Sequence, residues 1–186
     1  MQGRVLALVG MAGSGKTVCA QHLERRGFAQ FRFGSLVVEE VMRRGQPITP
    51  ENERIVREEL RKIYGMDAMA QLALPRLRAM LAERPNIVID GLYSFSEYKT
   101  LQRELGSQLI LVAIAADRAL RYARLAQRPE RPLTAPQALE RDYQEIERIE
   151  KGGPIAIADY TLLNNGSVPE LLEALDALLR RLDFQP

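Results

Sequence analysis

The sequence predicts an α/β fold in which one five-stranded parallel sheet is covered by helices on both faces. Short apolar runs alternate with segments of helical periodicity along the 186 residues, as expected for strands joined by crossover helices. The run at 86–90 contains three consecutive β-branched apolar residues, and the run at 109–114 is apolar throughout; both patterns are typical of parallel strands buried on both faces. The run at 5–9 leads directly into a glycine-rich turn and then a helix. Together these observations favour a three-layer, doubly wound domain.

The composition indicates one globular domain, which we expect to span residues 1–186. Hydrophobic residues make up 46% of the chain and charged residues 27%, and a chain of this length can fold without disulfides. The net charge of +2 gives no indication of a nucleic-acid or membrane partner. No secretory leader is evident, and the one cysteine excludes a disulfide framework. We therefore expect a cytoplasmic monomer or homodimer.

Residues 10–17 carry the strongest functional signal. The segment consists of Gly10, Met11, Ala12, Gly13, Ser14, Gly15, Lys16 and Thr17. It matches the phosphate-loop pattern G-x-x-x-x-G-K-[ST] between a strand and a helix, which is the context that this motif requires. The glycines allow backbone N–H groups to surround a phosphate, and the helix N-terminus adds positive potential. We expect Lys16 to reach the β and γ phosphates of ATP and the Thr17 hydroxyl to ligate Mg²⁺.

Two other interpretations of the loop are weaker. A chance glycine-rich turn does not account for the Lys-Thr pair. A dinucleotide site needs G-x-G-x-x-G and an acidic residue about 20 positions later, whereas the order here is G-x-x-G-x-G followed at once by Lys16. The sequence therefore predicts the three-layer fold of phosphate-loop NTPases.

The segment after the loop predicts a helix and a short strand. The helix is expected at 16–26, because Gly27 ends it. It carries Cys19 and His22, which we interpret as a small buried side chain and a surface or packing residue; the alternatives are a reactive thiol and a metal ligand. The strand is expected at 28–33, and it ends at Gly34-Ser35.

Residues 36–83 are expected to form a helical flap beside the phosphate loop. Three helices are predicted there, at 36–44, 50–64 and 67–83. Thr49 and Pro50 supply the N-cap and the first position of the second helix. Asp67 is expected to cap the third helix, and Pro75 to kink it. A flap inserted at this point is where a second substrate can be held.

Asp90 follows the buried strand at 86–90, so its side chain is expected to lie in the site. In phosphate-loop proteins such an Asp commonly holds Mg²⁺, directly or through water, and Asp90 and Thr17 therefore form the predicted metal site. The alternative is that Asp90 only caps the following turn. A helix at 96–105 and a fourth strand at 109–114 come next.

A dense cationic segment follows the fourth strand. Five arginines lie within residues 118–131, and Arg121, Arg124 and Arg128 have the spacing of one helix face. On its own, such a face is usually solvated. Opposite a phosphate loop, it predicts a short Arg-bearing lid over about 121–141, because a transferring phosphoryl group needs fixed cations and exclusion of water.

The rest of the chain predicts two helices and one strand. A helix at about 136–150 places Arg141 and Arg148 on its polar side. A fifth strand is expected at 159–163. The last helix begins at a capping box formed by residues 167–170.

With these landmarks, the chain resembles nucleoside-monophosphate-kinase-like proteins of the phosphate-loop class over nearly its whole length. It shares with adenylate kinases the loop, the Asp90-Gly91 pair after the third strand, and the lid motif R-x-x-x-R at 124–128. Residues 159–167 are similar to the last strand of dephospho-coenzyme A kinases. The resemblance is closest to a poorly characterised family of small ATP-binding kinases with the motifs R-G-x-x-x-T-P-E-N and Y/F-G-M-D-A-x-A, found here at 44–52 and 64–70.

This resemblance implies ATP and Mg²⁺ as cofactors and assigns three arginines. Arg124 is expected near the adenine and the phosphates, and Arg128 and Arg141 are expected to stabilise the moving phosphoryl group. The acceptor side departs from the better-known families. Residues 33–38 lack the acid and the arginine of T-G-D-x-x-R, and the run that begins with Asp90-Gly91 lacks the arginine of D-G-x-x-R or D-G-x-R. Dephospho-coenzyme A kinases have a catalytic Asp at the end of the second strand. Ser35, which stands at this position here, cannot replace that Asp as a base.

We therefore expect a kinase that transfers the γ-phosphoryl group of ATP to a small acceptor, and we favour a nucleotide or nucleotide-like molecule. The catalytic charge is expected from four cations: Lys16, Arg124, Arg128 and Arg141. The acceptor is expected to contact the turns after the second and third strands: Gly34, Ser35, Gly91 and Tyr93. Tyr93 either stacks on a base or fills space.

Two alternatives remain open at this point. The missing acceptor arginines also suit an ATP-binding regulatory or sensing module that presents a surface to a protein partner. A slow ATPase without an acceptor would need a Gln or Glu that positions water near the γ-phosphate, and Gln46 and Glu97 are too loosely placed in the sequence to support it. Nucleic acid and membrane are not expected as partners.

Overall fold

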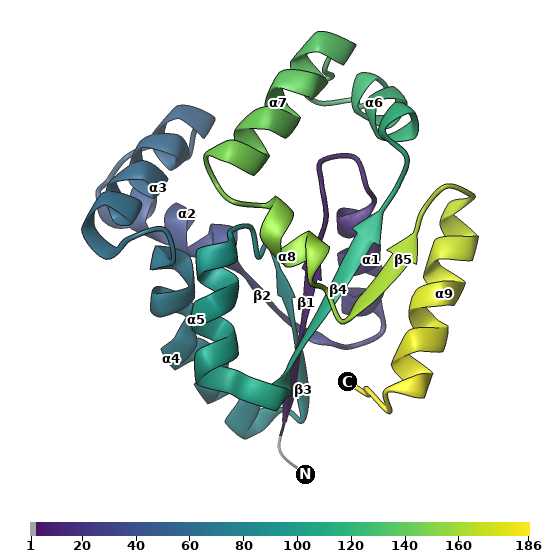
Figure 1. The fold of residues 1–186 in the computed structure, drawn as a ribbon. Coiled ribbons are helices and arrows are strands. Elements are labelled where there is room, and N and C mark those ends of the chain that lie inside the picture. Colours follow the sequence, from purple (N-terminus) through teal and green to yellow (C-terminus); the bar gives the residue numbers. More distant parts are fainter. Residues whose placement is uncertain (1–2) are drawn as a thin grey trace.

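A five-stranded parallel sheet forms the centre of the protein (Figure 1). The computed structural model describes residues 3–186, so the first two residues of the predicted domain lie outside the described part. The strands are β1 (Arg4–Val9), β2 (Ala29–Arg32), β3 (Asn86–Asp90), β4 (Leu109–Ala115) and β5 (Tyr160–Leu163). Their order in the sheet is β2-β3-β1-β4-β5, and every neighbouring pair is parallel. The predicted strand number and direction are confirmed.

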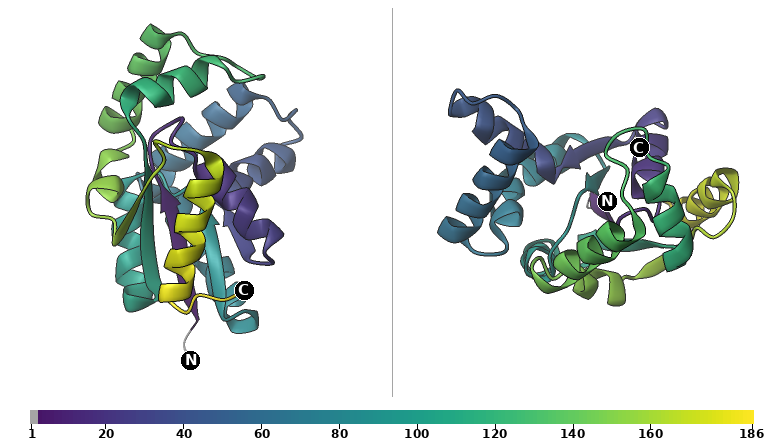
Figure 2. Two further views of the ribbon diagram at one scale, coloured as in Figure 1. Left: turned by 90° about the vertical axis from the view of Figure 1, so that its right-hand side faces the viewer. Right: turned by 90° about the horizontal axis from the view of Figure 1, so that it is seen from above.

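Helices cover both faces of the sheet (Figure 2). One face carries α1 (Lys16–Arg25) and α9 (Val168–Arg181). The other face carries α2 (Phe33–Arg43), α3 (Pro50–Tyr64), α4 (Ala68–Glu83) and α5 (Phe95–Leu105), which continues into the short turn η1 (Gly106–Gln108). Side chains of β1 alternate between these two cores, because successive strand residues point to opposite faces. The predicted layers of helix, sheet and helix are therefore confirmed.

The remaining helices lie above the carboxyl ends of the strands (Figure 1). They are α6 (Arg118–Ala126) and α7 (Ala135–Glu147), followed by the short α8 (Gly152–Ala156). α8 was not predicted, since its five residues carry no helical periodicity. α6 ends before Arg128, so the expected single helix face of Arg121, Arg124 and Arg128 is wrong; Pro129 and Pro132 interrupt the chain there. Among the helices of residues 3–186, none combines the length and apolar character needed to cross a bilayer.

Capping signals in the sequence located several helix ends correctly. The Thr49 side chain accepts a hydrogen bond from the Asn52 amide at the start of α3. Ser167 and Glu170 form the expected capping box of α9. Asp67 precedes α4, but its carboxylate does not cap that helix; it accepts hydrogen bonds from Thr100 Oγ1 (2.6 Å) and Gln71 Nε2 (2.9 Å).

Three other boundaries differ from the prediction. β2 pairs with β3 only from Ala29 to Arg32, and α2 begins at once with Phe33. The Phe33 side chain is 1% exposed, so its burial favours the earlier helix start and places Gly34 and Ser35 in the first turn of α2. α4 continues through Pro75 as one helix, and the kink at this residue stays a prediction. α7 ends at Glu147, three residues before the predicted end.

Candidate active site

The phosphate loop connects β1 to α1 and has a backbone that only glycine adopts easily. Gly13 and Gly15 have φ angles of +79° and +109°, in the left-handed region that disfavours side chains. A Cβ atom on Gly13 would also lie 2.7 Å from the Arg121 carbonyl oxygen. Gly15 is the N-cap of α1, and this helix start has neither a side-chain cap nor an acidic residue in its first turn. The positive end of α1 is therefore left free for an anion.

The side chain of Lys16 lies against the loop residues that precede it in the sequence. Its Nζ donates hydrogen bonds to the carbonyl oxygens of Gly10 and Met11, the latter at 3.0 Å. Burial lowers the pKa of Lys16 to about 7, and the nearby charge of Lys151 acts in the same direction. A lysine of this kind gains its full charge when an anion arrives beside it.

A cavity of about 560 Å³ opens next to the loop. It brings together the four predicted catalytic cations, Lys16, Arg124, Arg128 and Arg141, although they come from widely separated parts of the chain. The full lining consists of Ala12, Gly13, Gly15, Lys16, Thr17, Val18, Tyr93, Arg124, Arg128, Arg141 and Lys151. These residues include five cations and neither a carboxylate nor a histidine, so the cavity is suited to a polyanion. We refer to it as the loop cavity.

Arg124 is held between the loop cavity and the start of α9. Its Nη2 donates to the Asn164 carbonyl oxygen (2.8 Å), and Asn164 Nδ2 in turn donates to the Ser14 carbonyl oxygen of the loop (2.8 Å). Arg124 Nη1 is buried without a hydrogen-bond partner in the described part of the chain. A buried guanidinium donor without a partner is costly, which indicates that a ligand atom belongs there.

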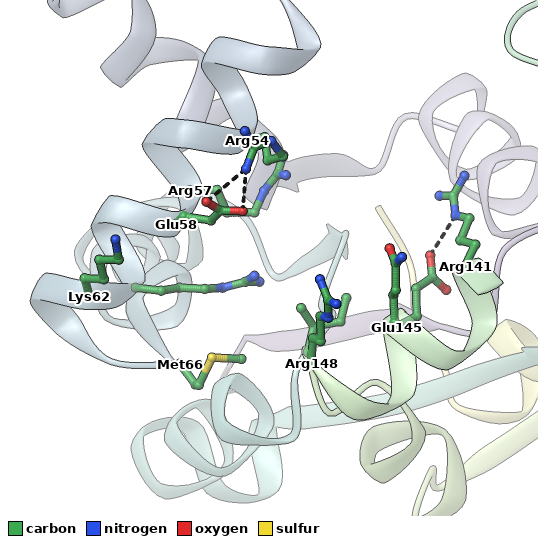
Figure 3. Close-up of a pocket in the computed structure, with 11 residues that line it drawn as sticks. Arg54, Arg57, Glu58, Lys62, Met66, Arg141, Glu145 and Arg148 are labelled. Carbon is green, nitrogen blue, oxygen red and sulfur yellow. Dashed lines mark hydrogen bonds and ion pairs between the residues drawn. The ribbon is translucent and has the colours of Figure 1, made fainter. Parts of the chain in front are cut away.

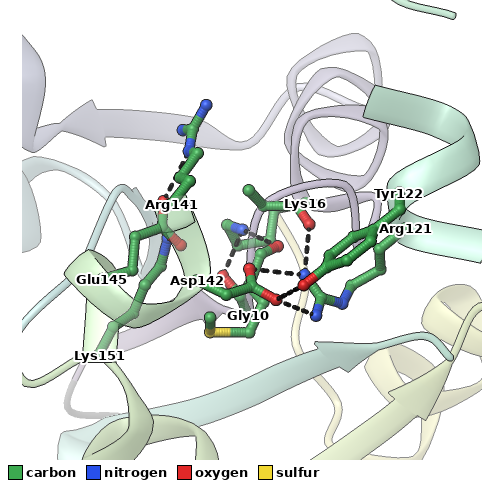
Figure 4. Close-up of polar contacts among 10 residues, drawn as sticks. Gly10, Lys16, Arg121, Tyr122, Arg141, Asp142, Glu145 and Lys151 are labelled. Atoms are coloured by element: carbon green, nitrogen blue, oxygen red, sulfur yellow. Dashed lines mark hydrogen bonds and ion pairs between the residues drawn. The ribbon is translucent and has the colours of Figure 1, made fainter. Parts of the chain in front are cut away.

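Arg121 has a different position from the one its spacing suggested. It forms an ion pair with Asp142, and each side chain is only 8% exposed (Figure 4). Arg121 Nη1 also donates to the Ala12 carbonyl oxygen at 3.0 Å, and the Tyr122 hydroxyl donates to Asp142 Oδ2 at 3.1 Å. These contacts connect α6 and α7 to the phosphate loop. Arg121 therefore positions the lid over the loop and does not line the cavity.

Lys151 is the cation of this site that the sequence analysis missed. Its Nζ donates to Glu145 Oε2 at 2.7 Å, and Arg141 Nε donates to the other oxygen of Glu145 at 3.1 Å (Figure 4). Burial lowers the pKa of Lys151 despite this carboxylate. Its Nζ lies 5.1 Å from the centroid of the Tyr93 ring, so Tyr93 packs against a cation at the cavity wall. One signal was available: lysine is rare in this chain, at positions 16, 62, 99 and 151 only.

The two predicted metal ligands lie at the edge of the site. Thr17 is exposed on the loop cavity, and Asp90 stands at the carboxyl end of β3. Burial raises the pKa of Asp90, and the charges of Arg32 and Lys16 oppose that shift. A hydroxyl and a carboxylate are ligands that suit Mg²⁺. Within residues 3–186 no cluster of three or more Asp, Glu, His or Cys side chains could hold a metal, so these residues fit Mg²⁺ only together with nucleotide phosphates.

The predicted acceptor residues are not gathered at one place. Tyr93 lines the loop cavity, whereas Gly34 and Ser35 belong to α2 and Ser35 Oγ donates to the Arg32 carbonyl oxygen at 2.8 Å. Gly91 has a φ of +98° and forms the turn after β3.

Cys19 and His22 have the positions that we expected. Cys19 is fully buried, and burial raises the pKa of its thiol to about 12, which confirms the interpretation as a buried side chain. His22 Nε2 lies 2.8 Å from Asp176 Oδ1 between α1 and α9.

Comparison with known proteins identifies relatives of this chain and its fold class. The family described as "AAA domain" matches residues 6–150. A UPF0200 protein of Thermococcus gammatolerans is 35% identical over 181 residues, which cover 96% of this chain and 95% of that protein. Among solved structures, a shikimate kinase from Acinetobacter baumannii has a TM-score of 0.56 at 18% identity, over 98% of this chain and 96% of that one. A gluconokinase from Sinorhizobium meliloti has a TM-score of 0.55 at 17% identity, over 98% and 97%. At such identities the two kinases show a shared fold alone.

Proposed function

Because this chain belongs to the AAA-domain family and to the UPF0200 protein family, and has the fold of phosphate-loop kinases, we propose that it is a kinase. It transfers the γ-phosphoryl group of ATP to a small acceptor in the presence of Mg²⁺, and we favour a nucleotide or nucleotide-like acceptor. The cytoplasm is the proposed compartment, because a chain with a single cysteine has no internal disulfide that requires an oxidising one.

The loop cavity carries this proposal. It combines the free N-terminus of α1 with five cations, Lys16, Arg124, Arg128, Arg141 and Lys151. The phosphates of ATP fit against the loop amides and Lys16, and Arg124 Nη1 supplies a donor that has no protein partner. Phosphoryl transfer depends on positioning and on neutralising charge that spreads over the γ-phosphoryl oxygens. A cavity with many fixed cations meets both requirements.

Four of these five cations have a proposed part in the reaction. Lys16 and Arg124 bind the donor phosphates, while Arg128 and Arg141 stabilise the group in transfer. Thr17 and Asp90 hold Mg²⁺, which supplies charge neutralisation at the phosphates. The lid formed by α6 and α7 lies over the loop through Arg121 and Asp142 and limits access of water, so that the acceptor is favoured over hydrolysis.

The test is ATP consumption by the purified protein with Mg²⁺, alone and with nucleoside monophosphates, dephospho-coenzyme A or small hydroxyl compounds. We expect turnover that depends on one acceptor and that falls at least a hundredfold in Lys16→Ala, with an unchanged circular dichroism spectrum. Arg78→Ala, on the outer surface of α4 in a pair with Glu104, is the control and should retain activity. Tight ATP binding without turnover would instead favour the sensing module, and unchanged turnover in Lys16→Ala would overturn the proposed site.

A further inference from the structure

A second cavity, of about 660 Å³, lies between α3 and α7 (Figure 3). We call it the α3/α7 cleft. Six cationic side chains line it: Arg54, Arg57, Arg61, Lys62, Arg141 and Arg148. Only two carboxylates, Glu58 and Glu145, share this lining. The cleft therefore has a large excess of positive charge in a protein whose net charge is only +2.

The two carboxylates are already engaged. Glu58 accepts from Arg54 Nη1 at 2.9 Å, which is a pair within α3. Glu145 accepts from Lys151 and Arg141. Neither carboxylate forms a hydrogen bond or an ion pair with the remaining cations of the cleft.

Those remaining cations lack counter-ions. Within residues 3–186, the side chains of Arg61, Lys62 and Arg148 form neither a hydrogen bond nor an ion pair, and Arg57 has only a 4.0 Å contact with Glu53. Arg61 Nε is buried, and burial lowers the pKa of this guanidinium. The charge of Arg57 also lowers the pKa of Arg61, and the charges of Glu97, Glu58 and Glu150 oppose these effects without cancelling them. An anion beside Arg61 would therefore be stabilised. Arg is suited to this because its planar fork can bind two oxygens of one phosphate.

The cleft is connected to the loop cavity through α7. Arg141 lines both cavities. Glu145 in the cleft holds Lys151, whose ammonium lines the loop cavity. A ligand in the cleft therefore lies on the other side of Arg141 from a nucleotide on the loop. This is the arrangement needed to bring two anions together, since Arg141 can contact both.

The chemistry of the loop cavity restricts the acceptor. A hydroxyl acceptor needs a general base. The lining of the loop cavity contains neither a carboxylate nor a histidine, Glu58 and Glu145 of the cleft are paired with cations, and Asp90 is the proposed ligand of Mg²⁺. A phosphate acceptor is already anionic. One of its oxygens can form the bond to the γ phosphorus while the bond to the β–γ bridging oxygen breaks and ADP leaves with that electron pair, so that no proton has to be removed.

We propose that the α3/α7 cleft is the acceptor subsite and that it takes a small molecule carrying a phosphate monoester, held by Arg57, Arg61 and Arg148. These arginines supply the phosphate-binding guanidinium groups that the turns after β2 and β3 lack. The proposal rests on the kinase function proposed above and adds the location of the acceptor and its charge class. A carboxylate-bearing or an uncharged acceptor is a competing outcome of the test.

The experiment measures binding separately from turnover. Isothermal titration calorimetry is carried out on protein saturated with Mg²⁺ and a non-hydrolysable ATP analogue. The titrants are four nucleoside 5′-monophosphates, their nucleosides and a sugar acid. We expect one or more monophosphates to bind at least a hundredfold more tightly than the matching nucleoside. Arg61→Gln and Arg148→Gln should each weaken that binding about tenfold or more, since each removes a charge-assisted hydrogen bond, and affinity for the ATP analogue should change less than twofold. Arg78→Gln serves as the matched control.

The outcomes separate this inference from the kinase proposal. The subsite is overturned if no monophosphate binds, if a nucleoside or a sugar acid binds as tightly, or if both arginine variants bind the monophosphate as the native protein does. If Mg-ATP is consumed with an uncharged acceptor and the variants keep that turnover, the kinase stands and the subsite falls. If a monophosphate binds through Arg61 and Arg148 but is not phosphorylated, the cleft stands as a monophosphate-binding site, and both the kinase function and the role of acceptor subsite fall.

Discussion

Binding of ATP is expected to take up about one proton at pH 8, and that proton goes to Lys16. Burial and the charge of Lys151 lower the pKa of Lys16 to about 7 in the free protein, so only about a tenth of the molecules carry the charged lysine at pH 8. A triphosphate beside Nζ favours the ammonium form. The bound lysine is then fully protonated, and the uptake is about 0.9 proton per ATP at pH 8 and about half a proton at pH 7. Calorimetric titration in buffers with different ionisation enthalpies measures this number directly.

Two variants show whether the proton belongs to Lys16. Lys16→Met should abolish the uptake at pH 8 and also flatten the dependence of stability on pH. The folded protein has a lowered pKa at this lysine, so the unfolded chain binds more protons between about pH 7 and the ordinary lysine pKa of 10.5, and the free energy of unfolding rises with pH over that window. Lys99→Met, on the surface of α5 beside Phe95, should leave both properties unchanged. Uptake below about 0.2 proton by the native protein at pH 8, or equal uptake by Lys16→Met, would refute the reasoning.

Two further predictions concern the lid and the loop. Asp142→Ala leaves the Arg121 guanidinium buried without its carboxylate and is expected to lower the free energy of unfolding by about 3 kcal/mol; Tyr122→Phe removes one hydrogen bond to the same carboxylate and should cost about 1 kcal/mol. Urea denaturation measures both, and equal losses would contradict the assignment of the buried ion pair. Gly15→Ala places a side chain at a φ of +109° and against Asn164, so it should weaken binding of an ATP analogue at least tenfold. Gly106→Ala also has a positive φ but open space around the new Cβ, and its ATP affinity should stay within twofold.

Most strands of the sheet could be predicted, because a strand that is buried on both faces contains consecutive apolar residues. β4 consists entirely of apolar residues and β3 has three consecutive ones at its centre, and both strands were located to within one residue at each end. β2 is an edge strand of four residues, so its pattern is short, and its boundary with α2 depends on where Phe33 finds a buried position. α8 is held by tertiary contacts with α5 and β4, which local periodicity cannot reveal. The errors therefore lie where packing decides between two conformations that the local sequence allows.

The donor side of the site could be predicted and the acceptor side could not. Residues 10–17 form a contiguous motif, and its loop geometry follows from glycines at fixed spacing. By contrast, Arg61 and Arg148 are 87 positions apart in sequence and line the same cleft only because the fold places α3 opposite α7. Neither arginine belongs to a recognisable pattern; Arg148 was expected only on the polar side of its helix, and no role was predicted for Arg61. Lysine usage was the available hint, since three of the four lysines line one of the two cavities.

One helix, α7, accounts for how the two cavities can act together. Asp142 fixes its position over the loop through Arg121. One turn further on, Glu145 holds Arg141 with one carboxylate oxygen and Lys151 with the other. When nucleotide phosphates bind in the loop cavity they compete with Glu145 for both cations, because the same ammonium and guanidinium groups face the ligand. A carboxylate that loses those partners adds negative charge beside the α3/α7 cleft, so the site has a physical means of making the affinity for one anion depend on the presence of the other.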